Sequence, residues 1–144
     1  MTGDKPRIVP FKAEHVLELE MVPLEYATIA ELALFYEANG ASFTAYAGDA
    51  IIGAAGAFSF MPGVLHVWFI PGVAAGDHKL WLIREIHKSL NELSIGTRRI
   101  QAYVNPENSK HMKFIKSFGF EYEGLHKALG PSGEDLCTFA RINN

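Results

Sequence analysis

The sequence predicts a domain of the α/β (α+β) class, and two kinds of pattern support this prediction. Short runs in which apolar residues alternate with polar or large ones are typical of strands, and longer runs with apolar residues at helical spacing are typical of helices. These runs follow one another along the chain without a linker, repeat or low-complexity tract. With 144 residues, 49% of them hydrophobic, residues 1–144 are expected to form one domain around a substantial core.

The first half of the chain is expected to hold four strands and two helices. Pro10 limits the pairing of the first strand, Asn39-Gly40 ends the second helix, and Gly48-Asp49 forms a tight hairpin turn. The nearly all-apolar run before Pro71 indicates a central strand. The expected strands are 7–11, 42–47, 50–60 and 64–70, and the expected helices are 13–19 and 24–38.

The second half continues with two helices and three strands. Asp77 is expected to cap a helix that ends at Leu93, because a side-chain oxygen can accept from the free amides of a first turn. Asn108 is expected to cap the next helix in the same way, and Gly119 suits the left-handed position that ends it. The positions expected to face the core in the earlier helix are Leu80, Leu82, Ile83, Ile86 and Leu90. The remaining expected elements are strand 99–104, helix 108–118 and strands 121–128 and 134–142.

The segment from Asn108 to Phe120 resembles the C-terminal half of the GNAT family of N-acetyltransferases. Its pattern is Asn-x-x-His-x-x-Phe-Ile-Lys-x-x-Gly-Phe, which follows a strand and a short turn over Pro106. The element order β-α-α-β-β-β-α-β-α-β-β agrees with that family. The resemblance implies a mixed central sheet flanked by helices, and a cleft into which acetyl-CoA slides. The pattern is closest to divergent GNAT-like proteins of tailed bacteriophages, including ones resembling internal virion proteins of short-tailed phages.

The resemblance also implies where acetyl-CoA binds. The backbone of Phe69 and Ile70 corresponds to the strand end that pairs with the pantetheine arm. The following loop corresponds to the one that cradles the pyrophosphate with its amides at a helix N-terminus. Asn108 opens the helix near the adenosine phosphate. The implied cofactor-binding residues are Phe69, Ile70, Gly72, Ala74, Ala75, Gly76, Asp77, His78, Lys79 and Asn108.

Two interpretations of that loop remain open. In the first, residues 74–78 form a compact anion nest, and Lys79 and Arg84 add positive charge. In the second, Asp77 is only a helix cap that uses the amides a pyrophosphate needs and repels it as well.

Four residues are candidates for proton transfer: His66, Glu37 and Tyr103 as the base, and His111 as a donor to the thiolate. Ile115 stands where family members carry the tyrosine that protonates the departing thiolate. Each candidate has a structural alternative, since a histidine or tyrosine on a sheet face or helix can simply hydrogen-bond or pack.

Composition excludes several classes of protein. A net charge of −3 argues against a general nucleic-acid binder, and no apolar run reaches the roughly 18 residues needed to span a bilayer. The single cysteine, Cys137, suits a buried position in a reducing compartment, and no secretory signal is visible, so a cytoplasmic location is expected. The sequence shows no metal-ligand spacing, serine elbow or phosphate-binding Gly-Lys-Thr motif.

Two functions are compatible with these observations. The first is an acetyl-CoA-dependent N-acyltransferase in which an amine attacks the thioester directly. The second is a catalytically silent GNAT-like phage protein with a structural role, packaged in the virion or assembled with other phage proteins.

Overall fold

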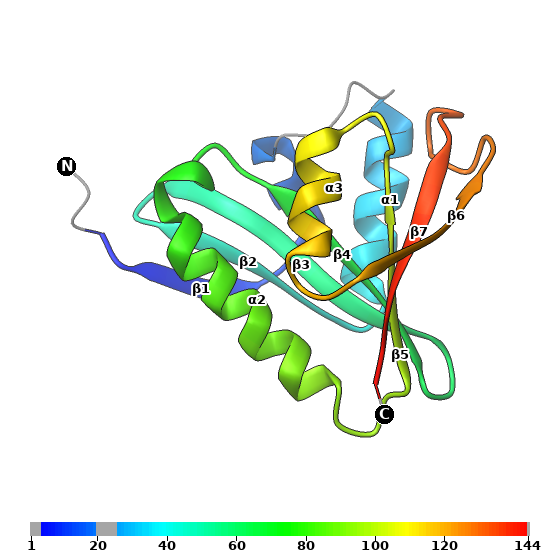
Figure 1. The fold of residues 1–144 in the computed structure, drawn as a ribbon. Helices are drawn as coiled ribbons and strands as arrows, with labels where there is room; N and C mark the ends of the chain where they lie inside the picture. Colours follow the sequence, from blue (N-terminus) through cyan, green and yellow to red (C-terminus); the bar gives the residue numbers. More distant parts are fainter. Residues whose placement is uncertain (1–3, 20–25, 144) are drawn as a thin grey trace. The chain divides into compact units, whose positions relative to one another are not determined.

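The computed structural model describes residues 4–19 and 26–143, and of residues 26–30 the backbone alone. Seven strands form a mixed sheet in the hydrogen-bonded order β1-β2-β3-β4-β5-β7-β6 (Figure 1). Only the β4–β5 pair is parallel among the pairs whose register is recorded in the described residues. The strands are β1 (Pro6–Pro10), β2 (Ala41–Ala47), β3 (Ala50–Met61), β4 (Val64–Pro71), β5 (Arg99–Val104), β6 (Glu121–His126) and β7 (Leu136–Ile142). The helices are η1 (Ala13–Glu18), α1 (Tyr26–Ala38), η2 (Gly76–His78), α2 (Lys79–Leu93) and α3 (Ser109–Lys116).

The predicted fold class and order of elements are confirmed, and the structure differs from the prediction at several element ends. The segment after β1 is a 3-10 helix, so its side chains do not follow the α-helical spacing expected of 13–19. The last strand begins at Leu136, two residues later than predicted, because Glu134 and Asp135 accept hydrogen bonds from backbone amides of the turn before it. The expected start of the second helix, at Leu24, lies outside the described residues.

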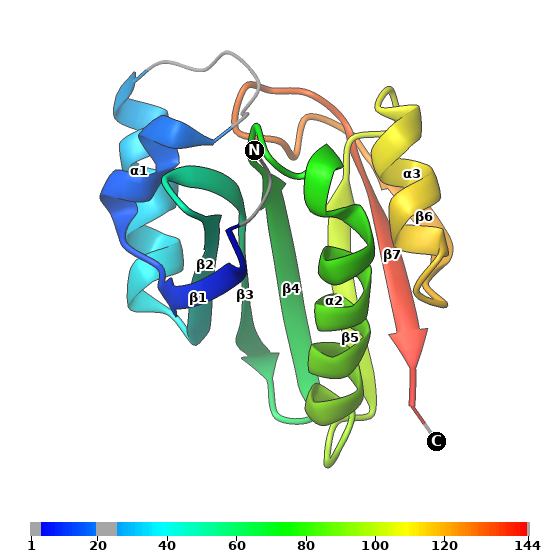
Figure 2. The ribbon, with the colours of Figure 1, turned by 90° about the vertical axis from the view of Figure 1, so that its left-hand side faces the viewer.

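The chain forms two compact units, residues 1–58 with 68–88 and residues 59–67 with 89–144. In the first unit, α1 and α2 lie on opposite sides of β3 (Figure 2). Ile51 packs on the α1 side and its neighbour Ile52 on the α2 side, because successive side chains of a strand point to opposite faces. A one-residue bulge at Ile52, opposite Ala45 and Tyr46, then returns Ala54 to the same side as Ile51.

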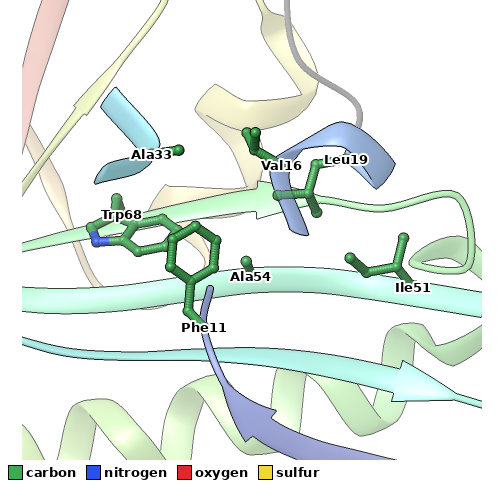
Figure 3. Close-up of a cluster of buried hydrophobic side chains, with 7 residues drawn as sticks. All are labelled: Phe11, Val16, Leu19, Ala33, Ile51, Ala54 and Trp68. Carbon is green, nitrogen blue, oxygen red and sulfur yellow. The ribbon is translucent and has the colours of Figure 1, made fainter. Parts of the chain in front are cut away.

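The core beneath α1 is aromatic as well as aliphatic. Figure 3 shows Trp68 and Phe11 side by side over Ala54, with Ala33 of α1 above them and Val16 and Leu19 nearby. On the other side of β3, Ile52 packs with Leu82 of α2 and with Ala74 from the loop before it. The loop between β4 and α2 is therefore anchored to the first unit by a buried side chain.

The second unit has one apolar and one polar face. Ile100, Ala102 and Val104 alternate along β5 and are buried, and Cys137 on β7 lies 3.7 Å from Met112 of α3 (sulfur to sulfur). The helix α3 therefore covers this face. On the opposite face, β5 presents residues 99, 101 and 103, whose side chains are polar or aromatic. Among the described residues, none of the helices has the length and apolar composition that crossing a bilayer requires.

Candidate functional site

The loop after β4 is tied to β3 by its backbone. Gly72 donates to the carbonyl of Ile52 at 2.8 Å, and Ala74 donates to that of Ile51 at 2.9 Å. Ala75 donates to Gly72 at 3.1 Å, closing a turn within the loop. These amides hold the loop in place. The bonds of Ala74 and Ala75 use two of the five amide donors expected for the nest over residues 74–78.

The expected α-helix begins at Lys79 as α2, and the 3-10 turn η2 (Gly76–His78) leads into it. Ala75, not Asp77, is the N-cap residue, and no side chain caps this end. The first helical hydrogen bond runs from the His78 amide to the Ala75 carbonyl at 3.3 Å. The prediction that Asp77 caps the helix is wrong, because Ala75 already has helical backbone angles and Asp77 lies inside the 3-10 turn with its side chain exposed.

Two amides at this helix start are available to a ligand. Within the described part of the chain, neither Gly76 nor Asp77 donates a backbone hydrogen bond, as expected of residues that precede the first helical bond. A Cβ at Gly76 would meet nothing within 4 Å. The fold therefore does not require glycine here, although close backbone approach by a ligand would.

The start of α2 also corrects one core prediction. Leu82 and Leu90 are buried as expected, and Ile83 and Ile86 are half-buried. Leu80 is 70% exposed. At about 100° per residue, it points roughly 100° away from the middle of the stripe formed by the other four positions. Beside it, Lys79 is exposed.

The helix α3 begins as predicted. The Asn108 side-chain oxygen accepts from the His111 amide at 3.1 Å, and Gly119 ends the segment with a φ of +85°. His111 lies on the first turn as an exposed residue, but partial burial of its ring lowers the pKa of the imidazole. Ile115 is half-buried, so the position of the usual tyrosine contributes to packing.

A pocket of about 300 Å³ lies on the polar face of the second unit. Its walls come from β5, β6 and β7 and from Phe60 at the end of β3. Tyr103 of β5 contributes a partly exposed ring. Across the pocket, the His126 Nε2 atom lies 2.5 Å from the Thr138 hydroxyl oxygen.

A chain of polar contacts joins residues of β4, β5 and β6 in this unit. On β4, His66 places Nδ1 3.4 Å from the Gln101 side-chain nitrogen on β5. Arg99 donates from Nε to the Gln101 side-chain oxygen at 2.9 Å. The two terminal nitrogens of Arg99 donate to the two carboxylate oxygens of Glu123 on β6, at 3.0 and 2.6 Å. The chain thus joins the buried His66 to a carboxylate in the pocket wall.

A β-bulge places Glu123 in this chain. Tyr122 pairs with Phe139 and Gly124 with Thr138, so Glu123 is an extra residue without a partner of its own on β7. Such a residue leaves the normal alternation and re-aims its side chain. Sequence alternation alone gives no warning of it, because a bulge depends on the partner strand.

Burial and the ion pair set the charges of these groups. Burial lowers the pKa of His66 to about 4, so its imidazole is neutral at pH 7. The hydrogen bonds from Arg99 hold the pKa of the Glu123 carboxyl below its usual value. Both partners of the ion pair are consequently charged at neutral pH.

Of the predicted proton-transfer residues, the structure brings two together. The rings of Tyr103 and His66 have their centroids 4.6 Å apart, and Tyr103 also lies 6.2 Å from the ring of His126. The sequence reasoning missed the pocket residues Arg99, Gln101, Glu123, His126 and Thr138. For Arg99 and Gln101 a signal existed, since polar residues at alternate positions of a buried strand mark a polar sheet face. Among the described residues, no group of three or more His, Cys, Asp or Glu is placed to hold a metal ion.

Comparisons with known proteins show the fold. No protein-family model matches the chain, and no curated protein matches it. Solved structures match over nearly its whole length. An acetyltransferase of Bacillus subtilis in complex with CoA superposes with a TM-score of 0.74 at 13% identity, covering 97% of this chain and 100% of that one. Ard1 of Thermoplasma volcanium gives a TM-score of 0.70 at 12% identity, with coverages of 96% and 98%. A GNAT acetyltransferase of Streptococcus pneumoniae gives 0.64 at 14% identity, with coverages of 97% and 100%. The chain therefore has the GNAT fold.

Proposed function

We propose that this protein is an acetyl-CoA-dependent N-acyltransferase. The amine nitrogen attacks the thioester carbonyl carbon, the carbon–nitrogen bond forms, and the carbon–sulfur bond breaks to release the CoA thiolate. The amine loses one proton and the thiolate gains one. The observation that carries the proposal is the turn η2 before α2, where the amides of Gly76 and Asp77 donate to no backbone carbonyl and a Cβ at Gly76 would meet nothing within 4 Å. An anionic pyrophosphate is the ligand that such a helix start suits.

In this proposal, backbone groups of the chain and one positively charged side chain bind acetyl-CoA. The pantetheine arm pairs with the backbone around Phe69 and Ile70, in the part of β4 that follows the three residues registered with β5. The pyrophosphate accepts from the amides of Gly76 and Asp77, and Lys79 adds a positive charge. Support for CoA as the ligand comes from the solved structure of similar fold that holds it.

The acceptor amine is assigned to the pocket on the polar face of the second unit. A neutral His66 with a pKa near 4 is a weak base, so it serves better as a fixed hydrogen-bonding group. His126, an imidazole in the pocket wall, is the residue to which we assign the amine proton. Tyr103 and His111 remain candidates for protonating the thiolate, because Ile115 supplies no acid.

The test is calorimetric titration of the full chain with acetyl-CoA, comparing the parent with Gly76→Ala. The parent should bind saturably. Gly76→Ala should bind about tenfold more weakly while keeping or raising Tm, since alanine is favoured in a helical turn whose surroundings are open. Gly124→Ala is the matched control, because its Cβ would also meet nothing within 4 Å. Absence of heat at millimolar acetyl-CoA would remove the proposal.

The alternative of a catalytically silent phage protein remains a prediction from the sequence. It rests on Ile115 and on the pattern between Asn108 and Gly119. Release of free CoA thiol on mixing the protein with acetyl-CoA and an amine would exclude the silent form. Mass spectrometry of purified virions would test the packaging, and absence of the chain from them would remove it.

A further inference from the structure

The carboxylate of Glu123 has a fixed position in the pocket wall. Its hydrogen bonds to Arg99 leave some of its acceptor sites available. Each of its oxygens accepts one hydrogen bond from Arg99. An ionised carboxylate offers about four lone-pair sites, so about two remain for a ligand. The bulge at Glu123 and the second anchor of Arg99 on Gln101 fix the direction of this group.

The guanidinium of Arg99 has no pair of parallel N–H donors left for an anionic ligand. Nη1 and Nη2 face Glu123, and Nε faces Gln101. The two N–H bonds that remain lie on different outer sides of the planar group, so no parallel pair of donors is left for a second carboxylate. Arg99 therefore serves to position Glu123.

The rest of the pocket wall suits an apolar or cationic body. Phe60 and Tyr103 are 51% and 39% exposed, so both present ring surface to the pocket. Aromatic faces attract ammonium groups as well as apolar groups. A volume of about 300 Å³ is at the small end of ligand pockets and suits a molecule of one ring and a short chain.

We propose that this pocket binds a small organic cation, a primary amine whose ammonium group contacts Glu123 and whose apolar body lies against Phe60 and Tyr103. It discriminates against amines that carry a carboxylate beside the nitrogen, because Arg99 has no paired donors to offer them. This rests on the proposed function in one respect only, that the bound cation is then the acetyl acceptor.

The test is binding of 2-phenylethylamine and phenylalanine to the full chain without acetyl-CoA, followed by NMR titration. The two probes share a ring and an amine and differ in the carboxylate. The amine should bind saturably and phenylalanine about tenfold more weakly. Equal or tighter binding of phenylalanine, or no saturable binding of the amine, would overturn the proposal.

Substitutions in the pocket wall test whether the amine binds at Glu123 and Phe60. Glu123→Gln should weaken amine binding about tenfold, whereas Glu121→Gln, which changes an exposed carboxylate of the same strand, should leave it unchanged. Because Glu123→Gln also loosens Arg99, Phe60→Leu provides a second variant at an exposed side chain and should weaken binding about two- to fivefold. Unchanged affinity in both Glu123→Gln and Phe60→Leu would contradict the assignment.

Failure of the amine site and failure of the proposed acyltransferase function give different experimental results. Amine binding without acetyl-CoA binding leaves the cation site standing and removes the acyltransferase. Acetyl-CoA binding without amine binding leaves the proposed acyltransferase standing and removes the cation site.

Discussion

The ring of Tyr36 lies flat against the indole of Trp68, with the planes 9° apart and the centroids separated by 4.0 Å. Phe11 contacts the indole edge-on at 5.3 Å. A third boundary is the backbone of β3 at Gly56, where an added Cβ would lie 2.7 Å from Trp68 Nε1. Helix α1, the residue that follows β1, and β3 thus fix one side chain of β4.

Gly56→Ala is expected to lower the free energy of unfolding by about 1–3 kcal/mol. The new methyl group overlaps the indole, which has no room to shift between Tyr36 and Phe11. Urea denaturation followed by circular dichroism measures the change. Gly124→Ala, whose Cβ meets nothing within 4 Å, is the control and should stay within about 0.5 kcal/mol of the parent. Equal midpoints for the two variants would refute the packing argument.

The buried His66 makes stability depend on pH. Its pKa of about 4 in the folded protein is below the ordinary value of 6.5, so the folded state resists a proton that the unfolded state binds. Stability should therefore be complete above pH 6.5 and fall as the pH is lowered towards 4, by up to about 3 kcal/mol.

Urea midpoints of the parent and of His66→Asn across this pH range measure that contribution. The variant should lose less stability on acidification, since it has no imidazole at this position to titrate. Parallel pH profiles would show that His66 is accessible to protons in the folded state.

Asn108→Ala is expected to destabilise the protein by about 0.5–2 kcal/mol. The substitution removes the side-chain oxygen that accepts from the His111 amide and leaves that donor at the start of α3 without its cap. Asn108→Asp keeps an acceptor in place and should retain most of the stability. Thermal unfolding of the three proteins gives the ranking, and an equal loss in both variants would speak against capping.

Local patterns predict most of this fold because its elements follow local rules. β5 has the predicted bounds, Asn108 caps α3, and Gly119 adopts the left-handed conformation that ends a helix. The sequence predictions fail where the local structure depends on contacts with other elements of the fold. Leu80 is three residues before Ile83 but is exposed, and Ala75 is the N-cap of η2 although alanine is a poor cap residue.

The candidate site is less predictable for the same reason. The Arg99–Glu123 contact joins residues 24 apart in sequence, across an intervening strand, and depends on a bulge defined by β7. The contact between His66 and Tyr103 arises only when β4 pairs with β5. The sequence could name those two residues as candidates but not the carboxylate beside them.

Asp77→Asn is expected to strengthen acetyl-CoA binding about two- to fivefold. The side chain caps nothing, so its removal costs only the attraction of a carboxylate to the helix start, about 0.3–1 kcal/mol. The same change lifts a repulsion between that carboxylate and a pyrophosphate bound to the amides of Gly76 and Asp77. Calorimetry at low ionic strength measures the gain, which should shrink as salt screens the charge.

Two controls separate this explanation from others. Asp49→Asn changes an exposed carboxylate in the turn between β2 and β3 and should leave acetyl-CoA affinity unchanged. Acetylpantetheine, which has no pyrophosphate, should bind the parent and Asp77→Asn equally. Weaker acetyl-CoA binding by a folded Asp77→Asn would mean that the carboxylate organises the loop for the ligand, since a purely repulsive charge cannot produce that sign.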